Sequence, residues 1–179
     1  FLRGLTGFRT LALIDGIRLN NSTFRSGPNQ YVSFIDPLIL DSTEIVFGPG
    51  SVLHGSDAAG GVIQMSSRIP RPGYQNGEGS RFFQRLSSAE QSSISRIEYE
   101  SISDETAFGF GASLKSYGDF YAGAEEGLQE ETGYSESSAN FSVVHDLENN
   151  LTLQFVVQSH RQDDVPRTHS TIYGSTWEG

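Results

Sequence analysis

The chain has 179 residues, 20 of them glycine and none cysteine, and a formal net charge of −10. This length favours one domain with enough chain to bury a core. The acidic balance disfavours nucleic acid as a partner, and the lack of cysteine excludes disulfides, thiolate zinc sites and thiol catalysis. No apolar run approaches the roughly 18 residues of a membrane-spanning helix. This does not exclude barrel strands, whose alternating residues average out in hydropathy. Because the chain begins at Phe1, not Met, we expect a piece of a longer protein.

Charge and composition divide the chain into two parts. Residues 1–72 hold six Arg and five Asp or Glu, a balance of +1, and are rich in Leu, Ile, Val and Gly. Residues 73–179 hold six Lys or Arg and 17 Asp or Glu, a balance of −11. Two prolines and a glycine in residues 69–73 end regular structure between them. We therefore predict a first domain over 1–69, a linker over 70–76 and a region of strands over 77–179.

Short strands and tight turns are expected at the start of the first part. The apolar run 10–14 stops at Asp15-Gly16, and alternating residues 17–19 follow, which predicts two strands around a tight turn. The polar stretch 20–31 then predicts a loop.

A short helix is expected next, over residues 34–40, because Asp36 suits its N-cap and Pro37 its first helical position. Three further elements follow between glycine-rich stretches. They are a strand over 44–47, one helical turn over 51–54 and a strand over 60–66.

The second part alternates apolar and polar residues in runs of about ten, the length of a tilted strand that crosses a bilayer. The positions opposite the apolar ones carry Arg, Glu, Gln, Asn and Lys, as a wet lumen requires. The apolar positions are Ile97 and Tyr99, then Phe108, Phe110, Ala112 and Leu114, then Ala139, Phe141 and Val143, then Leu151, Leu153, Phe155 and Val157.

The connections between these runs also alternate in length. Residues 103–105 and 147–150 form short turns, whereas 118–133 and the stretch from 161 onward are long and polar; the connection over 87–91 is short and breaks the rule. Short turns on one side and long loops on the other are typical of outer-membrane barrels. A soluble antiparallel sandwich with one wet face per sheet explains the alternation equally well.

The residue types that carry chemistry predict no enzyme active site, metal site or cofactor. Four side chains found in hydrolase triads lie close together: Ser51, His54, Ser56 and Asp57. They lack the G-x-S-x-G turn of such enzymes, and the glycine-rich stretch 48–61 lacks the lysine that ends a phosphate-binding loop. The four histidines have no metal-binding spacing. The acidic run 125–131 suits a solvated loop better than a Ca²⁺ site.

A series of motifs runs through residues 1–68 in a fixed order. It comprises Arg3-Gly4, LIDGIRLN over 13–20, Ile35-Asp36-Pro37, EIVFGPGSVLHGS over 44–56 and GGVI over 60–63. This series resembles the plug domain of TonB-dependent outer-membrane receptors, whose pattern reads roughly R-G, D-G-V/I and I-E-V-x-R-G-P-x-S-x-L-Y-G-x-x-A-x-G-G-V-I-N. Glycines at these turns allow positive φ and close backbone approach. The motif positions that we expect to be structural are Asp15, Gly16, Glu44, Gly48, Pro49, Gly55, Gly60 and Gly61.

Two residues depart from the family pattern. Phe47 stands where the family has Arg, and His54 where it has Tyr. In the family the Glu and Arg of this strand help to tie the plug to charges on the barrel wall. Glu44 is present without that Arg, so we expect a different plug-to-wall ion network. We expect His54 to be a partly buried structural residue.

The resemblance implies a mainly β fold: a small α/β plug domain followed by antiparallel amphipathic strands of a transmembrane β-barrel, truncated after about five strands. It implies a location in the bacterial outer membrane and energised uptake of a scarce nutrient such as a ferric siderophore, haem, cobalamin or glycan. The implied partners are outer-membrane lipid, an extracellular small ligand such as a metal chelate, and the TonB complex, whose contact segment lies outside this chain.

The resemblance also implies that the loop over 20–31 faces the ligand. Arg25, Asn29, Gln30 and Tyr31 would supply a cation, amides and an aromatic ring. The loop has no histidine, which disfavours haem as the ligand. The alternatives are a non-transporting surface-binding or signalling barrel and a soluble β-sandwich adhesin.

Overall fold

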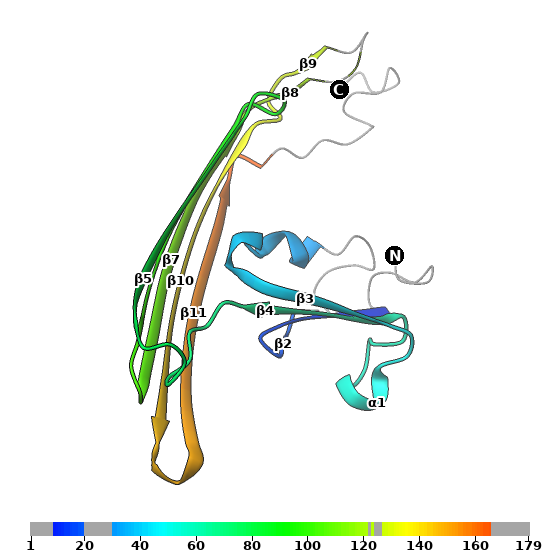
Figure 1. The fold of residues 1–179 in the computed structure, drawn as a ribbon. Coiled ribbons are helices and arrows are strands. Elements are labelled where there is room, and N and C mark those ends of the chain that lie inside the picture. Colours follow the sequence, from blue (N-terminus) through cyan, green and yellow to red (C-terminus); the bar gives the residue numbers. More distant parts are fainter. Residues whose placement is uncertain (1–8, 20–29, 122, 124–126, 166–179) are drawn as a thin grey trace. The chain divides into compact units, whose positions relative to one another are not determined.

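The computed structural model describes residues 9–19, 30–121, 123 and 127–165. Its chain divides into two compact units, residues 1–69 and residues 70–179, which are described separately below (Figure 1).

The first unit is built on a mixed four-stranded sheet with the order β2-β1-β4-β3. Strand β1 pairs in parallel with β4, and the other two pairings are antiparallel. Strand β1 has a neighbouring strand at each edge and hydrophobic side chains packed on both faces. This explains why its residues do not alternate between apolar and polar. The strands are β1 (Thr10–Ile14), β2 (Ile17–Arg18), β3 (Leu40–Phe47) and β4 (Gly61–Ser67).

Successive residues of β1 supply two separate hydrophobic clusters. Ala12 and Ile14 pack with Ile35, Ile39 and Met65. Leu11 and Leu13 point to the opposite face and pack with Ala58 and Val62. The core of this unit therefore lies on both sides of one strand.

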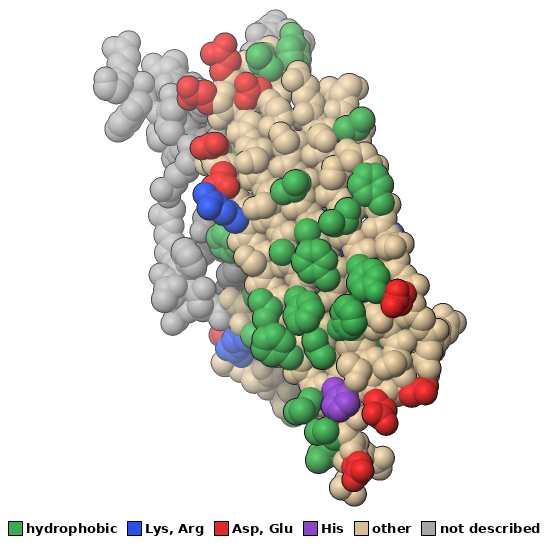
Figure 2. Space-filling model, turned by 90° about the vertical axis from the view of Figure 1, so that its left-hand side faces the viewer, with side chains coloured by type: hydrophobic (Ala, Val, Ile, Leu, Met, Phe, Trp, Pro, Cys, Tyr) green, Lys and Arg blue, Asp and Glu red, His purple; other side chains and the backbone are tan. Residues whose placement is uncertain are grey.

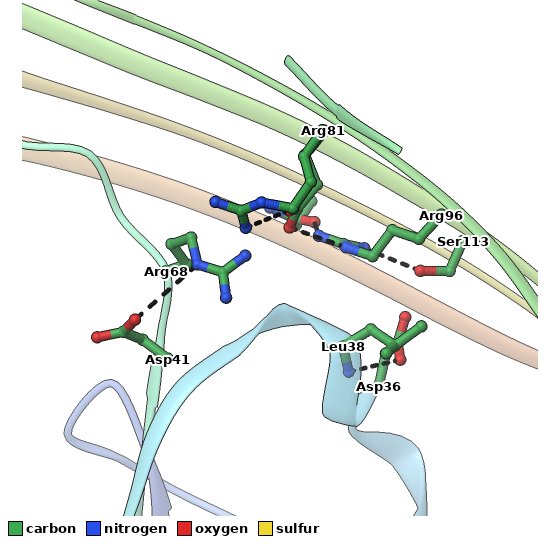
Figure 3. A network of polar contacts seen from close by, with 9 residues as sticks. Asp36, Leu38, Asp41, Arg68, Arg81, Arg96 and Ser113 are labelled. Carbon is green, nitrogen blue, oxygen red and sulfur yellow. Dashed lines mark hydrogen bonds and ion pairs between the residues drawn. The ribbon is translucent and has the colours of Figure 1, made fainter. Parts of the chain in front are cut away.

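The short helices confirm part of the prediction and correct the rest. Asp36 caps η3 (Pro37–Ile39) as expected, with its carboxylate 3.0 Å from the Leu38 backbone N–H (Figure 3). The helix that this cap predicts is present as η3 but is shorter than the 34–40 stretch, and a separate 3-10 helix, η2 (Gln30–Phe34), precedes it. Asp36 itself is extended, with ψ of 113°, the conformation that a following proline favours. The predicted turn over 51–54 is α1 (Ser51–His54).

The second unit is a five-stranded antiparallel sheet, β5-β6-β7-β10-β11, in which each strand pairs with the next along the sheet. The long connection predicted as a loop over 118–133 contains a small two-stranded ribbon, β8-β9. The elements are β5 (Gly77–Ser87), β6 (Ser92–Ile102), β7 (Thr106–Tyr117), β8 (Phe120–Tyr121), β9 (Leu128–Gln129), β10 (Tyr134–Leu147), η4 (Glu148–Asn150) and β11 (Leu151–Asp163).

The strand register places all four predicted apolar runs on the same face of this sheet, here called the apolar face. One row across it contains Tyr99, Phe110, Phe141 and Val157. Figure 2 shows hydrophobic side chains gathered over this face, with acidic side chains toward its two ends. The residues that alternate with the apolar ones along each strand, including Arg96, form the opposite face, here called the polar face. The mainly β fold and the amphipathic strands that the sequence predicts are therefore confirmed.

These five strands have 11 to 14 residues each, and a tilted strand needs roughly 9 to 11 to cross a bilayer. Among the described residues, no helix has both the length and the apolar character to span a membrane.

Candidate functional site

The Asp15-Gly16 turn fastens the first hairpin to the far end of β4. Both residues have positive φ, 49° and 80°, as a two-residue hairpin turn of this hand requires. The Asp15 carboxylate accepts hydrogen bonds from the Ser67 backbone N–H at 2.8 Å and from the Ser67 hydroxyl at 2.6 Å. Asp15 therefore has a structural role, because it connects the β1–β2 turn to the end of β4.

The glycine-rich segment after β3 is held by its own backbone. Gly48, at φ 106°, donates to the Gly60 carbonyl at 3.2 Å, and Gly50 donates to the Ala58 carbonyl at 2.8 Å. A Cβ at Gly50 would lie only 2.9 Å from Val62 Cγ2 in the core. The remaining motif positions are distributed around this turn. Pro49 lies between β3 and α1, Gly55 ends α1, Gly60 and Gly61 lead into β4, and Glu44 is exposed on β3.

The residues that could suggest a hydrolase triad have another arrangement. Asp57 forms an ion pair with Arg18 at 3.0 Å, and Arg18 also donates to the Ser56 carbonyl at 2.7 Å. These bonds connect β2 to the loop after α1. His54 is half-buried at the end of α1.

The predicted ligand-contacting residues are only partly within the described chain. Arg25 and Asn29 lie outside the described residues, and Gln30 and Tyr31 begin η2. Their roles stay predictions.

A polar network crosses the polar face of the five-stranded sheet, centred on Arg96 (Figure 3). The Arg96 guanidinium donates to Glu98 at 2.9 Å, to Ser113 at 2.8 Å and to Asn140 at 2.8 Å. Glu98 also accepts from Arg81 at 2.8 Å. One guanidinium thus joins β6, β7 and β10, and its side chain is only 4% exposed.

Gly111 on β7 makes room for that guanidinium. A Cβ at this position would overlap Arg96 Nη2 and lie 2.6 Å from the Asn140 side-chain oxygen. The missing side chain lets Arg96 lie flat across the neighbouring strand. The network therefore depends on Arg96 on β6 and on the absence of a side chain at Gly111, which lies beside it on β7.

Farther along the same face, toward the 118–133 connection, Lys115 pairs with Glu136 at 2.9 Å. Glu136 also accepts from Gln162 on β11 at 2.8 Å. Beyond this pair, Tyr117 and Tyr134 are stacked, with ring centroids 4.6 Å apart and planes 20° apart. This end of the polar face thus presents satisfied charges beside two aromatic rings.

The short β5–β6 connection at the same end is organised by Glu90. Hydrogen bonds from the Ser87 and Ser92 hydroxyls, together with Arg85, lower the pKa of Glu90 to about 2. The Glu90 carbonyl accepts from the Gly118 backbone N–H at 3.1 Å, which joins this turn to the start of the 118–133 connection. Within the part of the chain that the structure describes, no group of three or more His, Asp or Glu side chains could hold a metal ion.

The alternating pattern predicts Arg96, Glu98 and Asn140 on the wet side of their strands but does not predict that they form one network. The only signal was a glycine at an inward position of an alternating strand. Its meaning depends on the register between β6 and β7, which a single sequence does not reveal.

Comparison with known proteins matches residues 1–62 to the TonB-dependent receptor plug domain. One curated relative is the vitamin B12 transporter BtuB of Vibrio vulnificus, 36% identical over 67 residues. That match covers 37% of this chain and only 10% of the relative.

Solved structures share the fold over most of this chain. The copper transporter OprC aligns with a TM-score of 0.71 at 18% identity, covering 89% of this chain and 24% of that one. The ferric enterobactin receptor PfeA of Pseudomonas aeruginosa, solved as a variant with enterobactin, aligns with a TM-score of 0.61 at 16% identity, covering 89% and 26%. This chain thus spans about a quarter of those structures. Residues 1–62 thus match the TonB-dependent receptor plug domain, and the chain as a whole shares the fold of these solved structures.

Proposed function

We propose that this chain forms part of an outer-membrane transporter that captures a scarce nutrient and takes it up with energy supplied through TonB. The observation that carries the proposal is the combination of a plug domain with a sheet whose apolar side chains are exposed along one face. Ile97 is 53% exposed and Phe155 59% exposed on the apolar face. Apolar patches of this extent need a covering, and lipid is the covering that suits long amphipathic strands.

The soluble sandwich alternative loses support from the same sheet. A sandwich packs two sheets through their apolar faces, whereas the long strands described in residues 77–165 belong to one sheet. A surface-binding or signalling barrel without transport is distinguished only by an uptake measurement.

The proposed mechanism is differential binding without bond making. Ligand binding would favour a plug state that exposes the TonB-contacting segment. Arg25, Asn29, Gln30 and Tyr31 are the proposed plug contacts. The three relatives are named for unlike ligands: vitamin B12, copper and ferric enterobactin. The proposal therefore covers the class of transporter and leaves the ligand to experiment.

The test measures accumulation of cyanocobalamin, ferric enterobactin and Cu²⁺ by cells that carry the full-length receptor, with and without TonB. We expect one of them to accumulate only when TonB is present. Arg25→Ala combined with Tyr31→Ala should weaken binding, whereas Ser22→Ala combined with Thr23→Ala in the same loop should not. Ligand that binds but never accumulates would favour the non-transporting barrel, and unchanged affinity of the first variant would remove the loop from the site.

A further inference from the structure

The aromatic pair on the polar face lies where β7 and β10 enter their long connection. Tyr117 and Tyr134 are register partners on these two strands, and both are half-buried. The ribbon that continues from them presents Phe120 and Tyr121, which are 53% and 74% exposed. Four aromatic rings thus gather within a few residues of one strand end.

The base of that ribbon is fixed by hydrogen bonds. The Asp119 carboxylate accepts from the backbone N–H of Thr132 at 2.9 Å and of Gly133 at 2.8 Å. The Thr132 hydroxyl accepts from the Phe120 backbone N–H at 2.8 Å and donates to the Gln129 carbonyl at 2.7 Å. The aromatic rings are therefore presented on a preorganised support, which reduces the entropy lost on binding.

The charges around the rings disfavour an anionic ligand. Three cations lie at this end in the described residues, and each is already paired: Arg85 with Glu90 at 2.7 Å, Lys115 with Glu136 at 2.9 Å, and Arg161 with Asp163 at 2.6 Å.

Carboxylates at the same end exceed these cations. Glu130, Glu131 and Asp164 have no cationic partner within the described part of the chain. An anion would approach an acidic rim and have to break an ion pair to gain a cation. A neutral or cationic ring meets aromatic faces without that cost.

We propose that the Tyr117–Tyr134 stack and the β8-β9 ribbon form a ligand subsite that binds the ring face of an uncharged or cationic ligand. The subsite rests on the proposed function, because it assumes that the polar face lines a lumen and that this end is open to the outside. It adds the chemical class of ligand to that function.

The test is calorimetric titration of the purified full-length receptor with cyanocobalamin and maltohexaose as neutral probes and ferric enterobactin as the anionic probe. We expect a neutral probe to bind, and Tyr117→Ala combined with Tyr134→Ala to weaken it roughly tenfold or more, as loss of ring stacking does. Tyr117→Phe with Tyr134→Phe should keep the affinity within about twofold, because the rings remain.

Two further variants separate a lost contact from a damaged fold. Tyr121 is exposed, so Tyr121→Ala should lower the affinity for the neutral probe without lowering the melting temperature of the receptor. Tyr99→Ala removes a tyrosine from the apolar face and should leave the affinity unchanged. Equal affinity of the wild type and the double alanine variant would overturn the subsite. Binding of ferric enterobactin alone, or of no probe, would also overturn the subsite but leave the proposed transport intact.

Discussion

The two units of this chain place their apolar side chains in opposite ways. In the plug unit, residues Leu11 to Ile14 are at most 9% exposed and pack on both faces of β1. In the strand unit, Phe155 is 59% exposed, whereas Arg96 on the opposite face is 4% exposed. The same hydrophobic effect explains both patterns once the surroundings differ. The first unit buries its apolar side chains against one another, and in the proposed transporter the strands present their apolar face to lipid. The burial of Arg96 is therefore consistent with the strand register, in which the polar side chains share one face of the sheet.

The largest effect should come from opening a cavity in the plug core. Leu11→Ala removes a fully buried side chain and should lower the free energy of unfolding of the plug by about 2–5 kcal/mol. Val52→Ala is the control, because Val52 is 98% exposed and its truncation should cost less than about 0.5 kcal/mol. Thermal unfolding of the full-length receptor in detergent measures both. Equal shifts would mean that the core described here does not stabilise the plug.

A charge on the apolar face should cost nearly as much, but only in a bilayer. Val157 and Gln158 are neighbours on β11 and point to opposite faces. If the proposed transporter is correct, Val157→Arg should destabilise the folded receptor by about 2–4 kcal/mol, whereas Gln158→Arg on the polar face should cost less than about 1 kcal/mol. Denaturant titration in lipid vesicles makes the comparison. The reverse order would mean that the two faces have been assigned the wrong way round.

Filling the gap beside Arg96 should have a smaller effect. Gly111→Ala displaces the guanidinium, which is flexible enough to move but then loses hydrogen bonds to Ser113 and Asn140. We expect a loss of about 1–3 kcal/mol. Gly123→Ala is the matched control, since nothing lies within 4 Å of a Cβ there. If both alanines behave alike in the same denaturant titration, the network does not depend on Gly111.

The smallest effect is a local pH dependence at the β5–β6 turn. Hydrogen bonds from Ser87 and Ser92 lower the pKa of Glu90 from 4.5 to about 2. The ionised carboxylate stabilises the turn fully at pH values above its unfolded-state pKa of 4.5. That contribution is lost as the pH falls from about 4.5 toward 2. Protection of the turn amides from hydrogen exchange should therefore decrease over this window. Glu90→Gln should show low protection at every pH, and a wild-type turn indifferent to acid would contradict the role of Glu90.

The two units also differ in how much of them could be predicted from the sequence. Local signals sufficed for the Asp15-Gly16 turn, the Asp36 cap and the alternating runs, because each depends on neighbouring residues. The helix expected over 34–40 is shorter in the structure, Pro37–Ile39, because Pro37 keeps Asp36 extended, which is also the conformation of a capping residue. The ribbon in residues 118–133 was missed because two-residue strands leave no periodic pattern.

The network around Arg96 was beyond such signals for a different reason. Its members come from β5, β6, β7 and β10, and they meet only when the register is fixed. The predicted ligand contacts at Arg25 and Asn29 rest on the family resemblance alone. The aromatic pair at Tyr117 and Tyr134 likewise became visible only when β7 and β10 were aligned.

The parallel pairing of β1 with β4 has a consequence for the order of assembly. It joins Thr10 to Gly61, about fifty residues apart, whereas β5 and β6 meet through a turn of four residues. Closing a long loop costs chain entropy before any contact repays it, so sequence-distant pairings form late and adjacent hairpins form early. We therefore expect the β5–β6 hairpin to close faster than the β1–β4 pairing when the unfolded chain refolds, although β4 is synthesised before β5.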